Sequence, residues 1–276
     1  MPRRSVNGTE LYYELRGGPG DPAALVHGSW VDHHTWDRVL PGFARGLEVL
    51  TYDRRGHGES APGPRPHPVR DDAEDLAALL EAVNLHPVHL IAHSYGGAVA
   101  LRLAIDRPEL VRSLSIHEST FVGLLGEDPA TAPEWERLRA DIARLRGFVH
   151  RGERERAAEA FVERFASEPG AWARLPSSVR ATFVQNADRW AEELGDPDAV
   201  VPERPAVHDL LLPAILTEGS LSPPFVHRTN RSLARLLRNS HVQSIPEAGH
   251  APQLTNPDQF VGVILYFLLE RNVPGT

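Results

Sequence analysis

The chain has 276 residues, of which 29 are basic and 37 are acidic, so its formal net charge at neutral pH is −8. This balance disfavours nucleic acid or an anionic membrane as a partner, because both attract basic surfaces. All 29 basic residues are arginines and there is no cysteine. These absences exclude a lysine Schiff base, a phosphate-loop lysine, a thiol nucleophile, a thiolate metal site and a disulfide.

The chain shows no pattern typical of export or membrane insertion. Residues 1–10 carry two arginines, but no apolar stretch follows them, so we expect no signal peptide. The longest apolar run, residues 260–269, is far shorter than the roughly 20 residues that a membrane-spanning helix needs. We therefore expect a cytoplasmic protein without a membrane partner.

Short apolar runs alternate with helical patterns along the first part of the chain, as they do in a mostly parallel sheet with helices on both faces. Residues 9–15 alternate in polarity and predict an edge strand. Buried strands are then expected at 23–26, 48–52, 88–92 and 112–116, and helices at 34–44, 71–83 and 95–106.

The pattern changes after residue 119. Residues 133–193 are rich in arginine, glutamate and alanine, have helical spacing and show no strand pattern. Strand patterns resume at 211–216 and 241–245, and helices are expected at 225–238 and 257–270. An all-helical insertion inside an alternating sheet domain is typical of a cap. We expect an α/β core formed by residues 1–120 and 206–276, with a helical cap at 121–205.

A serine lies at a predicted turn from strand to helix. The apolar segment 88–92 leads into HSYGG at 93–97, where the helical pattern begins. A serine on such a turn adopts strained backbone geometry and presents its hydroxyl at the sheet edge. Ala92 and Gly96 flank Ser94 and are small enough to let strand and helix approach closely. A serine that only caps a helix gives a similar local pattern. The pattern around Ser94 alone therefore does not distinguish a nucleophile from a helix cap, and other segments of the chain are needed.

That context comes from two other segments. The strand at 23–26 ends in His-Gly and is followed by Ser29, whose backbone N–H is suitably placed for an oxyanion hole. A second N–H would come from Tyr95, at the start of the helix that follows Ser94. After the last predicted strand, His250 is suitably placed to act as a general base.

With HGSW at 27–30, DRRGHGES at 53–60, AHSYGG at 92–97 and EAGH at 247–250, the sequence resembles the α/β-hydrolase superfamily over nearly its whole length. The resemblance implies a mostly parallel, doubly wound sheet with an inserted all-helical cap. It also implies that Ser94 is the nucleophile and His250 is the base, in the chain order of that superfamily.

The carboxylate of the triad is less obvious. Many relatives carry an aspartate just after the strand predicted here at 211–216, but Ser222 occupies roughly that position, and a serine cannot stabilise an imidazolium by charge. Glu118 follows the preceding strand, where haloalkane dehalogenases and zearalenone lactone hydrolases carry their acid, and its His-Glu dipeptide is similar to that of the lactone hydrolases. We expect Glu118 to be the acid, with Glu218 as the alternative.

Other polar and aromatic residues have simpler interpretations. Asp32, His33, His34 and Asp37 could suggest a metal, but no second ligand cluster has recognisable spacing, so we expect no metal and no cofactor. Aromatic residues in a cap are more often core than ligand contacts, although pockets at such boundaries are lined by them. Possible pocket-lining residues are Trp30, His34, Trp172 and Phe183.

The residue types narrow the reaction. Ser94 disfavours dehalogenases and epoxide hydrolases of this fold, whose nucleophile is a carboxylate. Ala251 stands where a hydroxynitrile lyase would typically carry a lysine. We therefore expect a hydrolase of small-molecule carboxylic esters or lactones. The alternatives are a carbon–carbon bond hydrolase of the same fold and a catalytically silent ligand-binding relative.

Overall fold

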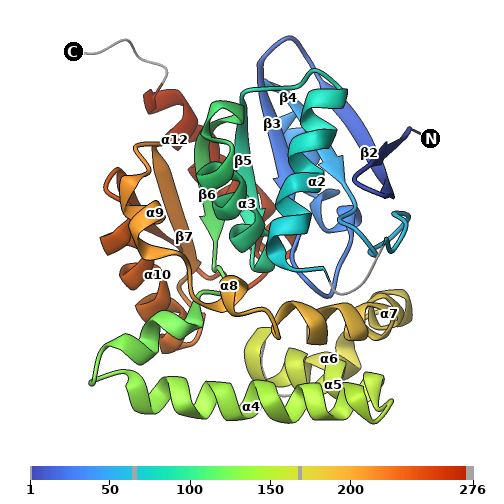
Figure 1. The fold of residues 1–276 in the computed structure, drawn as a ribbon, viewed down its shortest axis with the longest axis vertical. Coiled ribbons are helices and arrows are strands. Elements are labelled where there is room, and N and C mark those ends of the chain that lie inside the picture. Colours follow the sequence, from blue (N-terminus) through green and yellow to red (C-terminus); the bar gives the residue numbers. More distant parts are fainter. Residues whose placement is uncertain (1, 64–66, 167–169, 272–276) are drawn as a thin grey trace.

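The computed structural model describes residues 2–63, 67–166 and 170–271. Its centre is an eight-stranded sheet in the order β1-β2-β4-β3-β5-β6-β7-β8 (Figure 1). The strands from β3 to β8 are parallel to one another, whereas β1 and β2 form an antiparallel edge. The strands are β1 (Arg3–Val6), β2 (Thr9–Gly17), β3 (Asp21–Val26), β4 (Leu47–Tyr52), β5 (Val88–His93), β6 (Val111–His117), β7 (Ala214–Gly219) and β8 (Ser240–Ile245).

Helices cover both faces of this sheet and bury two separate apolar clusters. One cluster lies under α2 (Val69–Ala82), α3 (Tyr95–Asp106) and α10 (Pro224–Leu236). The other lies under the short α1 (Leu40–Phe43) and α12 (Pro257–Arg271). Central strands buried on both faces explain why β5, with the sequence VHLIAH, is buried at every position.

Between β6 and β7 the chain forms a helical region, and no strand occurs in the described part of this segment. Helices α4 to α7 of this region form a layer beyond one end of the sheet (Figure 1). This inserted helical region (residues 122–209) comprises η3 (Val122–Glu127), α4 (Ala132–His150), α5 (Arg154–Phe161), a π-helical turn (Val162–Ala166), α6 (Ala171–Arg174), α7 (Ser177–Glu193), α8 (Pro197–Val200) and α9 (Arg204–Asp209).

The α/β fold with an inserted helical region is confirmed, whereas the division of the chain at residues 120 and 206 stays a prediction. Three elements differ from expectation. Residues 9–15 were expected to form the edge strand, but β2 pairs with β1 on one side and with β4 on the other, so β1 is the edge. Residues 34–44 form a 3₁₀ turn (His33–Trp36) and the short α1 in place of one helix. The strand expected at 211–216 begins at Ala214, after Pro213, which has no backbone N–H, and it extends to Gly219.

Short elements complete the fold: η2 (Pro108–Leu110) precedes β6, and α11 (Pro252–Thr255) precedes α12. Among the described helices, none combines the length and the apolar character that crossing a bilayer would require.

Candidate active site

Ser94 lies on a tight turn between β5 and α3, with φ of 54° and ψ of −122°. This conformation is costly for a residue with a side chain and is stabilised here by the surrounding sheet. The Ser94 N–H donates to the carbonyl of His117 at 2.9 Å. A Cβ on Gly96 would lie only 2.2 Å from the carbonyl oxygen of Val26, so the close approach of helix and strand requires a residue without a side chain there.

His250 and Glu118 lie next to each other. The Nδ1 of His250 lies 2.7 Å from Oε2 of Glu118, in a hydrogen bond that joins residues 132 positions apart in the chain. With the proton of Nδ1 donated to the carboxylate, Nε2 of His250 is left with a free lone pair. A histidine in this tautomer can accept a proton from an attacking hydroxyl or water.

The backbone places Glu118 at the end of β6, beside the turn that carries Ser94. His93 and His117 are register partners in the parallel pair β5–β6 and are the last residues of these strands. Ser94 and Glu118 are therefore the first residues after two adjacent strands. Glu118 also has a positive φ, of 47°. The structure therefore brings both side chains to the same edge of the sheet.

The Glu118 carboxylate is buried and well supplied with donors. Its Oε1 accepts hydrogen bonds from the Gly219 N–H at 2.8 Å and the Ser222 hydroxyl at 2.5 Å. Burial opposes ionisation, but the adjacent His117 ring and the hydrogen bonds from His250 and Gly219 outweigh it and hold the pKa of Glu118 well below its usual range. Glu118 is therefore an anion at neutral pH.

Glu218 lies within β7 and is directed elsewhere. Its carboxylate contacts Nδ1 of His227 at 2.7 Å and the amide of Asn230 at 3.3 Å, both on α10. The register of β7 with β8 pairs Glu218 with Ser244, so this glutamate is one of the ladder residues and not the first residue after the strand. Among the described hydrogen bonds and ion pairs, none joins Glu218 to His250, so the structure does not bring this alternative acid to the histidine.

The side chain of His93 forms a hydrogen bond to the backbone of the loop that carries His250. Its Nε2 lies 2.7 Å from the carbonyl oxygen of His250, and the two rings lie 4.7 Å apart. Burial, together with the nearby histidines, lowers the pKa of His93 well below its ordinary value, so it is neutral and donates from Nε2. This hydrogen bond fixes the backbone of the loop that carries His250.

Two backbone N–H groups belong to segments next to Ser94: Tyr95 follows it in the chain, and a Cβ on Gly28, the residue before Ser29, would lie 3.1 Å from Cβ of Ser94. Tyr95 is the first residue of α3, so its N–H has no carbonyl within the helix to pair with. Ser29 follows the His-Gly pair after β3, and its N–H makes no hydrogen bond to another described residue. Free N–H groups at a helix start and a neighbouring loop are suited to stabilise a negatively charged oxygen.

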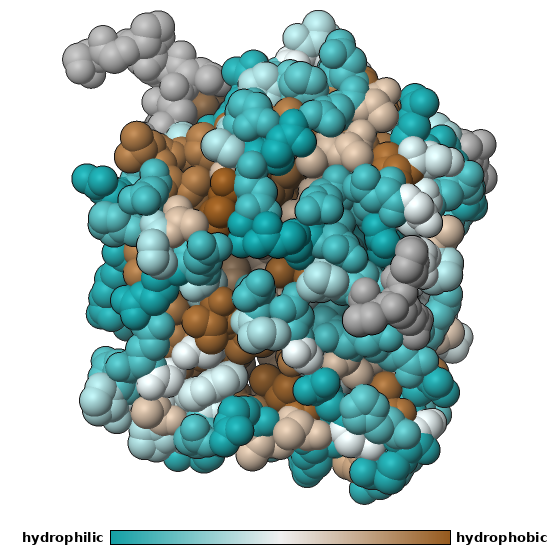
Figure 2. All heavy atoms as spheres, in the orientation of Figure 1, coloured by the Kyte–Doolittle hydropathy of each residue, from teal (hydrophilic) through white to brown (hydrophobic). Residues whose placement is uncertain are grey.

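Ser94, Glu118 and His250 line one pocket of about 600 Å³, including its open mouth. Figure 2 shows hydrophobic residues bordering a hollow where the inserted helical region meets the sheet. The other lining residues are mostly apolar and come from both parts of the fold: Ser119, Thr120, Val122, Leu138, Ile142, Phe161, Phe165, Trp190, Leu194, Phe225 and Val226.

The aromatic residues that line the pocket differ from those expected. Trp30, His34, Trp172 and Phe183 are not among the described lining residues. Trp30 instead packs into the core of the inserted helical region, where its ring stacks on Phe183 at 5.7 Å between centroids, and Trp172 belongs to the same cluster. His34 is exposed and contacts Asp37. Helical spacing shows that aromatics share a face, but it does not show which face meets the cleft.

A cluster of potential metal ligands lies apart from the triad. Asp32, His33 and Asp53 have ligand atoms within 4.8 Å of one another. The Asp53 carboxylate already accepts hydrogen bonds from the His33 N–H and Nδ1, and from the Glu59 N–H. These donors account for the buried charge of Asp53 without an ion, and we interpret the cluster as structural.

Comparison with known proteins assigns the family. Residues 24–263 match the alpha/beta hydrolase family, and the chain belongs to it. The chain is 29% identical, over 97% of its length and 69% of the relative's, to the dihydrolipoyllysine-residue acetyltransferase component of the acetoin cleaving system from Pseudomonas putida. It is 27% identical to 2-hydroxymuconate semialdehyde hydrolase from Pseudomonas sp. (strain CF600), over 92% of this chain and 89% of that protein.

A solved structure shows the same fold. The enol-lactonase from Burkholderia xenovorans LB400 superposes with a TM-score of 0.79 at 20% identity, covering 97% of this chain and all of that one (100%). At this level of identity the similarity concerns the fold.

Proposed function

We propose that this protein is a serine hydrolase of neutral carboxylic esters or lactones, with Ser94, His250 and Glu118 as its catalytic triad. The observation that carries the proposal is the 2.7 Å hydrogen bond from His250 to the buried Glu118 carboxylate, in the same pocket as a serine on a strained turn. Its membership of the alpha/beta hydrolase family supports the same class of reaction.

In the first half of the reaction, the Ser94 hydroxyl attacks the carbonyl carbon and gives its proton to Nε2 of His250. Glu118 then stabilises the imidazolium through the hydrogen bond at Nδ1. The carbonyl oxygen becomes an oxyanion that accepts hydrogen bonds from the N–H groups of Ser29 and Tyr95. His250 returns the proton to the leaving oxygen, and the alcohol departs or, with a lactone, stays attached through the acyl chain.

In the second half, a water molecule attacks the acyl group on Ser94 and gives a proton to His250. The second oxyanion is stabilised by the same two N–H groups. When it collapses, the bond to Ser94 breaks, the proton returns to the serine oxygen and the carboxylic acid is released. No step needs a metal, a cofactor or a second substrate besides water.

The pocket favours uncharged substrates. Among the described residues that line it, the only ionisable side chains are Glu118 and His250, and no arginine is present. An anionic substituent placed against residues such as Phe161 and Ile142 would lose its hydration without gaining a counter-ion, which is costly. The similarity to a hydrolase of 2-hydroxymuconate semialdehyde, an anion by its name, favours a carbon–carbon bond hydrolase, but the pocket offers no cation for such a group.

A matched pair of substrates tests both the reaction and the charge preference. p-Nitrophenyl butyrate and p-nitrophenyl hemisuccinate have acyl chains of equal length and differ by a terminal carboxylate. We expect hydrolysis of the butyrate, with kcat/KM for the hemisuccinate about 100-fold lower because its charge is buried unpaired. Neutral lactones of increasing ring size extend the comparison.

The serine is tested by labelling. A fluorophosphonate probe should modify the wild-type protein at Ser94, as located by peptide mass spectrometry, and should not modify Ser94→Ala. The Ser94→Ala variant should also lose about six orders of magnitude in kcat, as other serine hydrolases do when a triad member is removed. Absence of labelling in the folded protein would contradict the proposal and favour a ligand-binding relative, whereas labelling without ester or lactone hydrolysis would favour carbon–carbon bond cleavage.

A further inference from the structure

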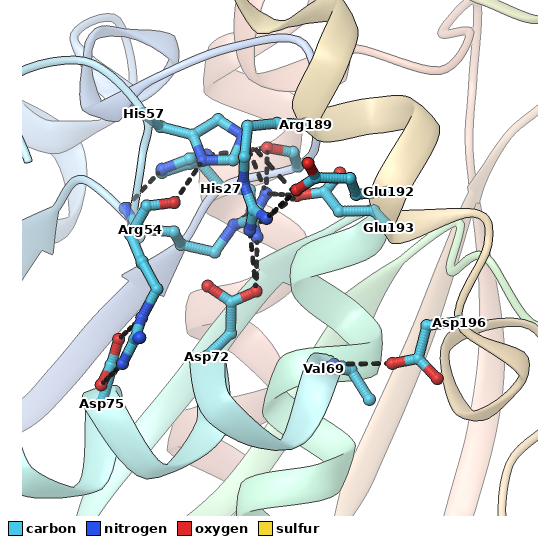
Figure 3. A network of polar contacts seen from close by, with 12 residues as sticks. His27, Arg54, His57, Val69, Asp72, Asp75, Arg189, Glu192, Glu193 and Asp196 are labelled. Carbon is cyan, nitrogen blue, oxygen red and sulfur yellow. Dashed lines mark hydrogen bonds and ion pairs between the residues drawn. The ribbon is translucent and has the colours of Figure 1, made fainter. Parts of the chain in front are cut away.

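A buried ion-pair network connects the inserted helical region with the loop that follows β4 (Figure 3). The Arg54 guanidinium contacts Glu193 of α7 at 2.7 Å and Asp72 of α2 at 3.1 Å. Arg189 of α7 adds a second cation, 3.6 Å from the same oxygen of Asp72. All four side chains are at most 2% exposed, so each charge depends on the others for its stabilisation.

Arg54 also holds the backbone of the oxyanion loop (residues 27–29). Its Nε donates to the carbonyl of His27 and its Nη2 to the carbonyl of Gly28, both at 3.1 Å. The Arg54 backbone N–H donates to Nε2 of His27 at 2.9 Å, so the proton of that ring is on Nδ1, which lies 2.7 Å from the Gly28 carbonyl. The Gly28 carbonyl therefore has two donors, the Arg54 side chain and the His27 ring, and the Arg54 backbone N–H sets the tautomer of that ring.

The orientation of that carbonyl sets the orientation of the Ser29 N–H. Gly28 and Ser29 are joined by a trans peptide, in which the C=O and the N–H point in opposite directions. Because Arg54 and His27 bind the carbonyl on one side, the N–H of Ser29 points to the other, away from Arg54. Rotation of this peptide plane would break two buried hydrogen bonds.

Arg54 contacts the second oxyanion donor residue as well. Its guanidinium carbon lies 4.6 Å from the centre of the Tyr95 ring, in a cation–π arrangement within a fully buried site. One side chain thus contacts the carbonyl of the peptide that carries the Ser29 N–H and the ring of Tyr95, which supplies the other N–H. Glu193 connects that side chain to the helical region that covers the pocket.

We propose that Arg54 is a positioning residue that sets the geometry of the oxyanion hole, and that Glu193 of α7 holds Arg54 in place so that the hole is formed when the inserted helical region is docked. This inference rests on the proposed function, since it requires that the N–H groups of Ser29 and Tyr95 stabilise an oxyanion.

Arg55 provides a matched control. It is the next residue, is also buried, and forms an equally close ion pair with Asp75 of α2, at 2.6 and 2.7 Å. It contacts neither the oxyanion loop nor α7 in any described hydrogen bond or ion pair. Loss of Arg55 therefore measures what a buried ion pair in this loop does for stability alone.

The experiment compares Arg54→Met, Arg54→Lys, Glu193→Gln and Arg55→Met for kcat, KM, thermal unfolding and inhibition by a transition-state analogue such as a trifluoromethyl ketone. We expect kcat to fall about 10- to 100-fold in both Arg54 variants, less than the loss when an oxyanion donor is removed outright. KM should change by no more than about threefold, and the inhibition constant of the ketone should rise by the same factor as kcat/KM falls. Glu193→Gln should show the same signature at a smaller size.

Arg54→Lys separates the two roles, because lysine keeps the charge but cannot bridge two carbonyls and two carboxylates. It should recover most of the unfolding temperature lost in Arg54→Met without recovering kcat. Arg55→Met should lose stability and keep kcat within about threefold of wild type. If Arg54→Met does not fold, Arg54→Lys and Glu193→Gln decide the question.

The inference is overturned if folded Arg54→Lys and Glu193→Gln keep wild-type kcat and ketone inhibition, as Arg55→Met does. The network would then only stabilise the fold. Failure of the proposed function is distinguishable. In that case the wild-type protein would show no Ser94-dependent hydrolysis, so there would be no wild-type kcat with which to compare the variants.

Discussion

The hydroxyl of Ser222 donates a hydrogen bond of 2.5 Å to Oε1 of Glu118. Ser222 follows β7, roughly where many relatives carry the acid of their triad, whereas Glu118 follows the neighbouring strand β6. The other oxygen of Glu118 binds His250. Ser222 therefore stabilises the Glu118 carboxylate by a hydrogen bond, and Glu118 contacts His250 from the end of the adjacent strand β6.

The first prediction compares Glu118→Gln with Glu218→Gln. Glutamine at 118 keeps the shape but loses the charge that stabilises the imidazolium, and it can hold His250 in the wrong tautomer. We expect kcat to fall by about four orders of magnitude for Glu118→Gln. Glu218→Gln should stay within about threefold of wild type, since that side chain contacts His227 and Asn230. Steady-state kinetics on one ester is sufficient, and a large loss in the second variant alone would identify Glu218 as the acid.

The second prediction concerns Ser222→Ala. The variant removes one donor to a buried carboxylate, which destabilises the folded protein at neutral pH by about 1–3 kcal/mol. The hydrogen bonds from His250 and Gly219 remain, so we expect kcat to fall by about tenfold at most. Chemical denaturation at pH 7 measures the stability. A loss of kcat as large as that of Glu118→Gln would show that the hydroxyl does more than support the carboxylate.

The strands of the core were predictable because each is an apolar run bounded by turns. The runs at 48–52, 88–92 and 112–116 all lie within observed strands. Where apolar residues continue past a strand, the pattern misleads: Leu211 was assigned to a strand, but its side chain is 72% exposed and Pro213 separates it from β7. That shift moved Glu218 from the expected strand end into the ladder.

Ser94 and His250, each identified from one residue type at one turn, line the same pocket in the structure, and their catalytic roles stay predictions. The site was not predictable where the outcome depends on which way a helix faces. Phe161 and Phe165 line the pocket and Phe183 does not, although all have helical spacing.

The contacts of Arg54 were not predicted from the sequence either, because DRRGHG has no spacing that indicates a contact with residues 27–29. Its only signal was a pair of adjacent arginines shortly after the apolar strand run at 48–52.

The third prediction tests the pocket wall. Ile142 of α4 lines the pocket, so Ile142→Ala should create room for a longer acyl chain. Each additional buried methylene is worth about 0.8 kcal/mol, or about a fourfold increase in kcat/KM. We expect the preferred p-nitrophenyl ester to become about two methylenes longer. Val149→Ala is the control, because Val149 is on the same helix but belongs to the core of the inserted helical region. An unchanged preference in Ile142→Ala would place the acyl chain elsewhere.

The fourth prediction is a loss of stability in mild acid, carried by buried histidines. Burial, with charged neighbours as a smaller effect, lowers the pKa of His27 to about 3 and that of His117 to about 4, and it lowers the pKa values of His57 and His93 well below normal. In the unfolded chain these histidines titrate near pH 6.5. Below that pH the unfolded state binds more protons than the folded state, so the free energy of unfolding decreases as pH falls.

This stability is fully present above about pH 6.5 and is lost as pH falls toward 4, at a rate of about 1.4 kcal/mol per pH unit for each histidine. Four such groups would reduce a typical domain stability of about 5–15 kcal/mol to zero within a few pH units. We expect the unfolding temperature to fall steeply below pH 6, as measured by calorimetry across pH 8 to 4.5. His117→Gln should make this dependence shallower, because it removes one of the four buried histidines. An unfolding temperature that stays constant down to pH 4.5 would show that these histidines are protonated within the folded protein.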